Sequence, residues 1–320
     1  MNDLAIQTDR LVVKYRGKAA LDGFTLGVPR GSVYALLGDN GAGKSTAMKV
    51  LTGQVRADAG RATLLGLDCW SKAYDLRQRV GYVPDRPKLY DWMTVGEVGW
   101  FAAGFYAPGF RDKYTDWVER LRLDPAKKLK DLSKGGYARV WLALALAPDP
   151  EVLLLDEPTS GLDLITRREF LAGLVEFAAE GRTILISSHS IAELERTASH
   201  AGFVKDGKLF LSATLDDLRT KFRRVSLRYE GLMPDAAALG KVHETQRTGR
   251  FVQYLIEDPD AYQLAQLRAT PGITDIEDQA VSLEEVYAAV MAHPASSPRA
   301  VPFGTNGEAH AAAVESGVRS

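Results

Sequence analysis

Cysteine is nearly missing from this sequence, and so is any excess of charge of one sign. Cys69 is the one cysteine among 320 residues, so no intramolecular disulfide can form. No group of cysteines and histidines has the spacing of metal ligands, which fits a reducing compartment. The 40 basic and 41 acidic side chains nearly cancel, and no overall field favours nucleic acid or an anionic lipid surface. These absences argue against a disulfide-rich secreted domain and against a generally basic nucleic-acid-binding protein.

Long hydrophobic runs are also missing. The N-terminus has neither a basic start nor a continuous apolar core, so we expect no signal peptide and a cytoplasmic location. The most apolar stretch, residues 90–110, is interrupted by Asp91, Glu97, four glycines and a proline. It falls short of the roughly 20 apolar residues that a spanning helix needs. We expect it to be buried or to face a partner, and any membrane association to depend on that partner.

What the sequence does contain is a series of short apolar runs that do not alternate with polar residues. They lie at residues 33–37, 152–155 and 183–186. Such runs are typical of strands buried on both faces of a parallel sheet. Helical patterns lie between and after them, at residues 43–53, 137–147 and 166–179. The alternation predicts an α/β core over residues 1–220.

Two further segments depart from this core pattern. Residues 89–147 are rich in helical patterns and hold four of the five tryptophans, which predicts an inserted helical subdomain. From residue 221 to 293, alternating strands predict a small α/β appendage, whose final helix is announced by the capping-box residues Ser282 and Glu285. Residues 294–320 have few large apolar side chains, so we expect a disordered tail.

The most specific motif is a G-x-x-x-x-G-K-S loop placed between an apolar strand and a helical pattern. It comprises Gly38, Asp39, Asn40, Gly41, Ala42, Gly43, Lys44 and Ser45, and Thr46 follows. Glycines let the backbone amides turn toward phosphate oxygens, and the helix presents its positive N-terminal end to the same anion. Lys44 would reach the β and γ phosphates and Ser45 the magnesium ion. The alternative is an ordinary glycine turn.

A pair of carboxylates follows a second apolar strand. Asp156 and Glu157 come at the C-terminal end of residues 152–155, the edge where ligands bind in open α/β sheets. Asp156 would hold hydrated magnesium, and Glu157 would polarise an attacking water. Taken alone, such a pair is more often a helix cap or a surface feature.

Together with two further motifs, these residues resemble the nucleotide-binding domain of ABC transporters. The glycine loop is followed by Leu-Ser-Lys-Gly-Gly at residues 132–136, by Asp-Glu-Pro-Thr-Ser-Gly-Leu-Asp at 156–163, and by Ser-Ser-His at 187–189. The resemblance covers residues 4 to about 218. It implies a P-loop NTPase core of the ABC-ATPase type, ATP and Mg²⁺ as ligands, and a head-to-tail dimer with a second copy.

The resemblance also implies roles for residues outside the glycine loop. Tyr15 matches an aromatic that stacks on adenine, although a core tyrosine is the alternative. Ser133, Gly135 and Gly136 match the signature that meets the γ phosphate of ATP held by the opposite subunit. Asp163 matches a residue that communicates between the two sites, and it could equally be a helix N-cap.

Catalysis is implied for three residues. His189 matches a histidine that contacts the γ phosphate and orders the surroundings of the attacking water. It would act with Glu157 and with Lys44. The remaining four histidines have no comparable context.

The sequence departs from the family pattern at two places. Asp85 stands where a glutamine links magnesium to the surface that meets the membrane subunit, and a carboxylate can still coordinate the ion. Lys134 replaces a glycine of the signature and Gly136 a polar residue. Lys134 could add a cation near the phosphate or point to solvent.

These departures resemble those of bacterial ATPases that work with export permeases of the ABC-2 type. We therefore expect an ATPase that drives a separately encoded membrane permease, with no nucleic acid as partner. The aromatic residues Tyr90, Trp92, Trp100 and Phe101 would either seat a permease helix or, as we expect for most of them, form subdomain core. Two alternatives are a soluble ATP-driven switch acting on nucleic acid or ribosomes, and a regulator that binds ATP without hydrolysing it.

Overall fold

The computed structural model describes residues 3–85, 88–231, 233–234, 236–292 and 299–300. A central sheet has the strand order β15-β10-β9-β3-β8-β7-β6. Its strands are β3 (Val33–Leu37), β6 (Val80–Val83), β7 (Val152–Asp156), β8 (Thr183–Ser188), β9 (His200–Lys205), β10 (Lys208–Thr214) and β15 (Arg299–Ala300). Strands β6, β7, β8, β3 and β9 run parallel, which confirms the predicted parallel core.

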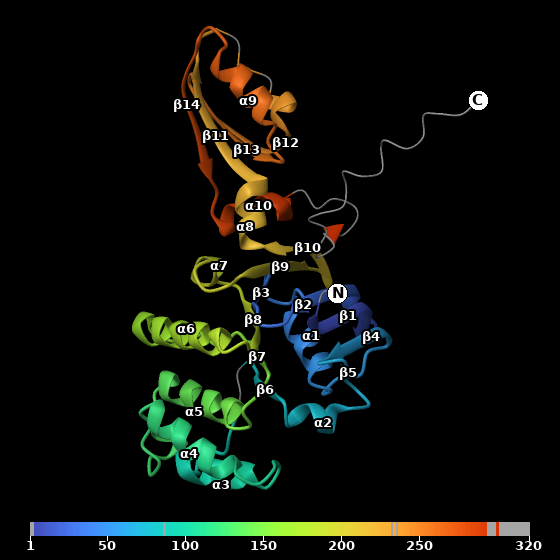
Figure 1. Cartoon of the computed structure of the whole chain (residues 1–320), viewed down its shortest axis with the longest axis vertical. Coiled ribbons are helices and arrows are strands. Elements are labelled where there is room, and N and C mark those ends of the chain that lie inside the picture. The colour runs from blue at the N-terminus through green and yellow to red at the C-terminus, as the bar shows by residue number, and fades with distance from the viewer. Residues whose placement is uncertain (1–2, 86–87, 232, 235, 293–298, 301–320) are drawn as a thin grey trace, which may run out of the picture.

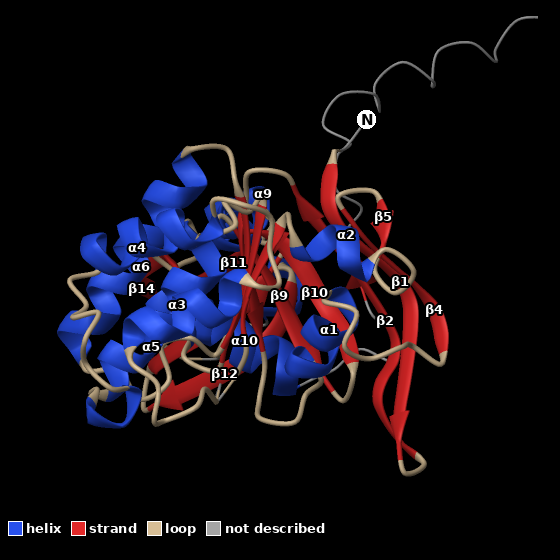
Figure 2. Cartoon of the chain, turned by 90° about the horizontal axis from the view of Figure 1, so that it is seen from below, coloured by secondary structure: helices blue, strands red, loops and turns tan. Residues whose placement is uncertain are grey.

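A second, antiparallel sheet covers one face of the central sheet. It has the order β2-β1-β4-β5. Its strands are β1 (Leu4–Tyr15), β2 (Lys18–Pro29), β4 (Ala59–Leu64) and β5 (Leu67–Asp68), and the short helix α2 (Ala73–Arg77) follows them. Figure 2 shows these strands on the side of the central sheet opposite to α3–α6.

Both faces of the central sheet are buried, as the unalternating apolar runs predict. Alternate residues of β3 belong to different cores: Ala35 and Leu37 pack in the cluster on the α6 side, while Tyr34 and Leu36 pack with α1 (Lys44–Leu51) and the antiparallel sheet. Helices α6 (Leu164–Ala179) and α7 (Ile191–Leu194) contribute to the first cluster.

The inserted segment is helical. It contains α3 (Val95–Ala103), α4 (Phe110–Arg120), η1 (Leu129–Asp131) and α5 (Lys134–Leu146). A separate core holds these helices together, and Tyr114, which is 2% exposed, packs against Gly99 at its centre. Helix α5 begins three residues before the predicted start at 137, because the Ser133 hydroxyl accepts a hydrogen bond from the Gly136 amide and caps the helix one turn earlier.

The appendage forms a four-stranded antiparallel sheet with the order β12-β13-β11-β14 (Figure 1). Helix α8 (Leu215–Lys221) leads into it, and its elements are β11 (Phe222–Tyr229), η2 (Ala236–Leu239), β12 (Lys241–Thr248), β13 (Phe251–Glu257), α9 (Ala261–Arg268), β14 (Ile273–Ala280) and α10 (Leu283–Ala292). The sequence predicted β11 and β13 but missed β12 and β14. Both are edge strands with few buried residues, so they lack the apolar alternation that marks a strand.

The capping box predicted at Ser282 is present. The Glu285 carboxylate accepts from the Ser282 amide at 2.7 Å, and the Ser282 hydroxyl accepts from the Glu285 amide at 3.3 Å. Although α10 falls within the predicted appendage, its apolar residues pack in the same cluster as β3 and β9.

Two further expectations from the sequence concern membrane-spanning helices and the C-terminal tail. No helix within the described ranges is long and apolar enough to cross a bilayer. The predicted disordered tail, residues 294–320, lies outside the described residues except for Arg299–Ala300, which pair with β10.

Candidate functional site

The glycine loop connects β3 to α1 and requires glycine at two positions. A Cβ atom on Gly38 would lie 2.3 Å from the Val204 carbonyl oxygen, and one on Gly43 would lie 2.7 Å from the Ala20 carbonyl oxygen. Gly43 also has φ of +114°, a conformation that other residues rarely adopt. The loop therefore folds tightly against β9 and the start of β2, and the unpaired amides at the start of α1 open onto it.

Lys44 lies across this loop. Its side chain is 5% exposed, and its Nζ donates to the Gly38 carbonyl at 2.5 Å and to the Asp39 carbonyl at 3.3 Å. The same Nζ lies 3.3 Å from Glu157 Oε1. The loop and the carboxylate pair, separated by more than 100 residues in the chain, thus meet at the C-terminal edge of the sheet, as the sequence predicted.

The two carboxylates at the end of β7 keep oxygen atoms without hydrogen-bond partners. Asp156 is 1% exposed; its Oδ1 accepts from the Ser187 hydroxyl at 2.6 Å. Its Oδ2 is buried and has no hydrogen bond among the described residues. Glu157 Oε1 is buried as well, with Lys44 Nζ 3.3 Å away. A buried carboxylate oxygen such as Asp156 Oδ2 fits a hydrated cation. Across the described residues, no group of three metal-ligating side chains occurs.

Glu157 adopts a strained backbone conformation at the centre of the site. Its φ of +51° lies in the left-handed region, which is uncommon for a residue other than glycine. Its amide donates to the Ser187 hydroxyl at 3.0 Å, and its Oε2 lies 2.7 Å from His189 Nδ1. The structure thus brings Lys44, Glu157 and His189 together around one carboxylate.

Ser187 is a residue that sequence reasoning missed. Its buried hydroxyl donates to the Asp156 carboxylate and accepts from the Glu157 main-chain amide, so it orients the Asp156 carboxylate and the backbone of Glu157. The sequence signal for Ser187 was its position two residues before His189. In the structure it lies near the end of β8, which pairs with β7 in the sheet.

Ser133 and Asp163 lie apart from this cluster, at the starts of α5 and α6. Asp163 caps α6 by accepting from the amides of Ile165 and Thr166 at 3.1 and 3.0 Å. The hydrogen bonds from Thr166 hold the pKa of Asp163 below its ordinary value. Gly135 lies beside Thr166, since a Cβ there would be 3.2 Å from the threonine methyl group. Among the described residues, no hydrogen bond or ion pair joins this group to the glycine loop.

The structure places Tyr15 and Asp85 at the surface. Tyr15, at the end of β1, is 46% exposed and so is not a core residue. Asp85 is exposed just after β6. Strand β6 runs parallel to β7 with Val83 opposite Leu155, so Asp85 and Asp156 follow at the same end of the sheet. Burial raises the pKa of Tyr82, and the carboxylates of Asp156 and Asp85 raise it further. Lys134 is exposed, with its chain beside Gly161.

The aromatic residues of the helical subdomain correct one expectation. Most were expected in the core, but Tyr90, Trp92 and Trp100 are 58%, 65% and 63% exposed, and Phe101 is 44% exposed. Rings of Tyr90 and Trp92 lie 5.9 Å apart, and those of Tyr90 and Phe101 lie 6.1 Å apart. They form an exposed aromatic surface, because the helical core is filled by smaller side chains and by Tyr114 and Phe110 instead.

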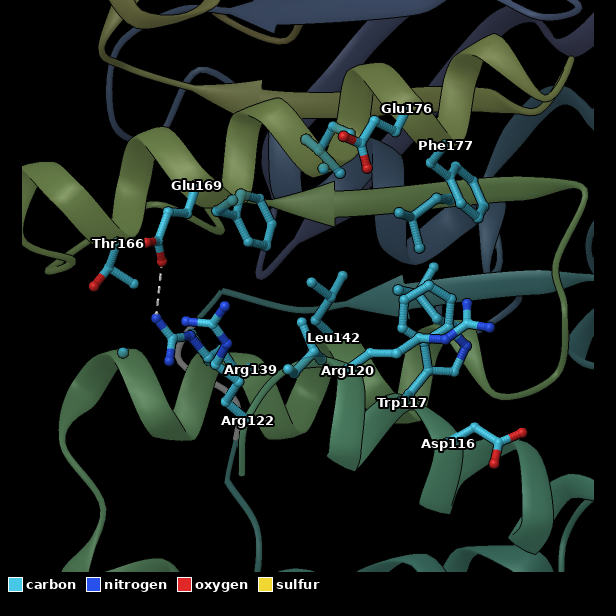
Figure 3. A pocket seen from close by; sticks show the side chains of 18 of the residues that line it. Asp116, Trp117, Arg120, Arg122, Arg139, Leu142, Thr166, Glu169, Glu176 and Phe177 are labelled. Carbon is cyan, nitrogen blue, oxygen red and sulfur yellow. Dashed lines mark hydrogen bonds and ion pairs between the residues drawn. The ribbon is translucent and has the colours of Figure 1, made fainter. Parts of the chain in front are cut away.

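A cavity of about 820 Å³ separates the helical subdomain from α6. Figure 3 shows Trp117, Arg120 and Leu142 on one side of it and Thr166, Glu169 and Phe177 on the other. Arg139 and Glu169 form an ion pair across it at 3.2 Å. Of the predicted site residues, only Gly135 lines this cavity.

Cys69 and His243, to which the sequence assigned no role, have buried side chains. Burial raises the pKa of the Cys69 thiol to about 12. His243 has a buried side chain whose Nε2 lies 2.7 Å from Glu257 Oε2 in the appendage.

The segment that carries these motifs matches models of known protein families. The ABC transporter family profile matches residues 21–160. A second profile, described as an AAA domain, putative AbiEii toxin, Type IV TA system, matches residues 137–195.

Individual proteins show the same similarity. The chain is 36% identical to an uncharacterized ABC transporter ATP-binding protein, all4389, of Nostoc sp., over 62% of this chain and 61% of that protein. It is 34% identical to the daunorubicin resistance ATP-binding protein DrrA2 of Streptomyces coeruleorubidus, over 68% of this chain and 70% of that protein. A solved structure titled as the ATP binding subunit of an ABC transporter superposes with a TM-score of 0.62 at 28% identity, over 68% of this chain and 92% of that one.

Proposed function

The chain belongs to the family of ABC transporter ATP-binding proteins, and on this basis we propose that it binds ATP with magnesium, hydrolyses it and drives a separately encoded export permease. One observation carries the proposal. Lys44, Glu157 and His189 converge at one edge of the sheet, beside Asp156, whose buried Oδ2 has no hydrogen-bond partner in the described part of the chain.

Each residue of the convergent site has a distinct task. The amides of the glycine loop and Lys44 bind the phosphates. Ser45 and Asp156 would hold magnesium, which when bound would offset the phosphate charge. Asp85 follows β6 at the same end of the sheet as Asp156. Tyr15 offers an exposed ring to the adenine base.

Hydrolysis requires water to attack the terminal phosphate. Glu157 orients that water and takes its proton as the oxygen bonds to phosphorus, and the bond to the bridging oxygen breaks to give ADP and phosphate. His189, which contacts Glu157 at 2.7 Å, keeps the carboxylate in place.

A second copy of the chain completes the site. Ser133, Gly135, Gly136 and Asp163 sit together at the starts of two helices but away from the glycine loop of their own chain. Serine hydroxyl and helix-start amides suit a γ phosphate, so in this proposal they meet the ATP of an opposed copy in a head-to-tail dimer.

The permease contact is proposed at the exposed aromatic surface. Large aromatic rings that are half exposed or more are costly to leave in water and are typical of protein interfaces. Tyr90, Trp92, Trp100 and Phe101 lie on the helical subdomain and would seat a helix of the membrane subunit at the inner face of the membrane. The similarity to a daunorubicin resistance protein supports an export direction.

The proposal is tested with purified protein, MgATP and two variants. Glu157→Gln removes the base, so turnover should fall at least about 100-fold while binding persists. In MgATP this variant should also accumulate as a dimer in light scattering. Lys44→Ala should weaken ATP binding by about tenfold or more, because a charged hydrogen-bond donor is lost.

Glu176→Gln, an exposed position on α6, serves as the matched control for the amide substitution. Wild-type chain that binds no ATP would overturn the proposal. Binding without any turnover would support the alternative of a regulator that does not hydrolyse ATP.

A further inference from the structure

The loop that joins Glu157 to α6, residues 158–163, is held by side chains from two helices. It folds into two successive turns, with Glu157 at its start and the N-cap residue Asp163 at its end. Loops are generally more mobile than the elements they connect, so contacts with neighbouring elements decide how firmly this one is held. Helices α6 and α7, which lie on the same face of the central sheet, supply these contacts (Figure 1).

Arg167 holds the end of the loop. It lies in the first turn of α6, where its amide donates to the Asp163 carbonyl at 3.0 Å. Its side chain turns back toward the loop, and Nη2 donates to the Leu162 carbonyl at 3.1 Å. The Leu162 side chain is itself buried. The guanidinium group therefore connects the first turn of α6 to the last turn of the loop.

Glu193 of α7 connects Arg167 to the other half of the loop. Its Oε1 forms an ion pair with Arg167 Nη1, and its Oε2 accepts a hydrogen bond from the Thr159 hydroxyl at 3.4 Å. The two charged side chains are only 27% and 19% exposed, so solvent screens their attraction less than it would at an open surface. Charge-assisted hydrogen bonds of this type are among the stronger ones in proteins. The pair thus spans the loop from Thr159 to Leu162.

Helix α7 gives Glu193 a fixed support. Ile191 and Leu194, on either side of Glu193 in the sequence, are buried in the same core cluster as α6. Directly after α7, Glu195 Oε1 accepts a hydrogen bond from the Leu283 amide at 3.2 Å. Leu283 is the first residue of α10, so the appendage also anchors this segment.

The loop and α7 meet again at Glu157. Helix α7 begins two residues after His189, whose Nδ1 lies 2.7 Å from Glu157 Oε2. The loop begins directly after Glu157, whose left-handed φ of +51° persists only if surrounding contacts hold the backbone. A shift of the loop would therefore displace the Glu157 backbone, and a shift of α7 would displace His189.

We propose that Arg167 and Glu193 are positioning residues, whose ion pair connects the loop after Glu157 to the segment after His189 and so fixes both groups for hydrolysis. This inference rests on the proposed ATPase function. Among the described residues, neither side chain forms a hydrogen bond or ion pair with the glycine loop. Loss of the pair should therefore lower kcat and leave the affinity for MgATP unchanged.

The test is Glu193→Gln in the full chain, a change that keeps the size of the side chain and removes its charge. Small displacements of catalytic groups have large effects on rate, so kcat should fall about tenfold, with the Kd for MgATP within about twofold of wild type. Arg167→Met should behave alike. The kcat is expressed per ATP-binding site counted by nucleotide titration, so a misfolded fraction does not enter it. Arg168→Met, at the exposed neighbour on α6, is the matched control and should change neither constant.

A double-mutant cycle tests whether the two residues act as a pair. Either single change breaks the ion pair, so the kcat of the Arg167→Met, Glu193→Gln variant should be close to that of the slower single variant. Multiplying effects in the double variant would overturn the inference. So would a wild-type kcat in Glu193→Gln, or a rise in its Kd as large as its loss of kcat. A wild-type chain that binds MgATP without hydrolysing it would instead overturn the proposed function.

Discussion

At the scale of single residues, the site is organised by a serine that carries no charge. Ser187 links Asp156 to the Glu157 backbone through one hydroxyl, at 2.6 and 3.0 Å. Carboxylates that must hold a cation and orient water need fixed oxygens, and outer partners of this type commonly matter almost as much as the ligands. The left-handed φ of Glu157 adds to this, because strain persists only where the surrounding contacts hold it.

Ser187→Ala tests that role. The Asp156 carboxylate and the Glu157 main chain would lose their shared partner, so kcat for ATP hydrolysis should fall about 10- to 100-fold with MgATP affinity changed much less. Steady-state kinetics and nucleotide titration measure the two effects separately. Ser188→Ala is the control, since that buried hydroxyl contacts Ser190 and no carboxylate. Full activity in Ser187→Ala would show that the carboxylates are oriented by other means.

At the scale of elements, the appendage is joined to α8 by a buried carboxylate. Glu257, at the end of β13, is 4% exposed. Its oxygens lie 2.7 Å from His243 Nε2 on β12, 2.8 Å from Lys241 Nζ and 3.0 Å from Lys221 Nζ at the end of α8. The hydrogen bond with His243, together with the two lysines, holds the pKa of Glu257 well below its ordinary value of 4.5, although burial acts in the opposite direction.

This lowered pKa predicts a pH-dependent stability. A carboxylate with a depressed folded pKa stabilises the native state above its unfolded value, 4.5, and that contribution is lost as the pH falls toward the folded value. Glu257→Gln should therefore lower the free energy of unfolding at pH 7 by about 2 kcal/mol, and the difference from wild type should shrink below about pH 4. Urea unfolding at several pH values measures it.

The exposed Glu244→Gln on β12 is the matched control and should unfold like wild type. A difference for Glu257→Gln that stays constant from pH 7 to pH 3 would mean that packing, not the ionised carboxylate, holds the appendage to α8.

At the scale of the whole molecule, two different surfaces are proposed to contact other chains. The starts of α5 and α6 present Ser133 and Asp163 to a second copy in the proposed dimer, while the aromatic surface around Tyr90 and Trp92 faces outward from the helical subdomain. The cavity between α4, α5 and α6 separates the helical subdomain from α6.

The aromatic surface predicts a specific loss of membrane-partner binding. Trp92→Ser removes a 65% exposed indole that contacts Tyr90, so hydrolysis by the isolated chain should persist. Capture of an integral membrane protein from detergent extracts, followed by mass spectrometry, should fall sharply, since interface tryptophans often contribute about 2 kcal/mol or more. Trp70→Ser, at a 50% exposed tryptophan outside the subdomain, is the control and should capture as much as wild type. Undiminished capture by Trp92→Ser would move the permease contact elsewhere.

The sequence by itself determined the parallel core, the glycine loop and the carboxylate pair. Buried strands such as residues 152–155 are marked by continuous apolar runs, and the loop must have glycine where backbone atoms approach within 3 Å. Each requirement restricts the residue types of one short segment, so it is visible in the sequence. The N-cap alternative at Asp163 follows the same logic, because capping joins residues two or three apart, whereas the start of α5 was predicted three residues too late.

Only the tertiary structure decided which distant groups meet. It paired Ser187 with Asp156 and exposed most of the aromatic residues that were expected in the core. Contacts between elements depend on how helices and sheets pack, and the edge strands β12 and β14 are defined by pairing with neighbours and not by their own side chains. Neither the packing between elements nor the pairing of these edge strands produces a short-range pattern in the sequence.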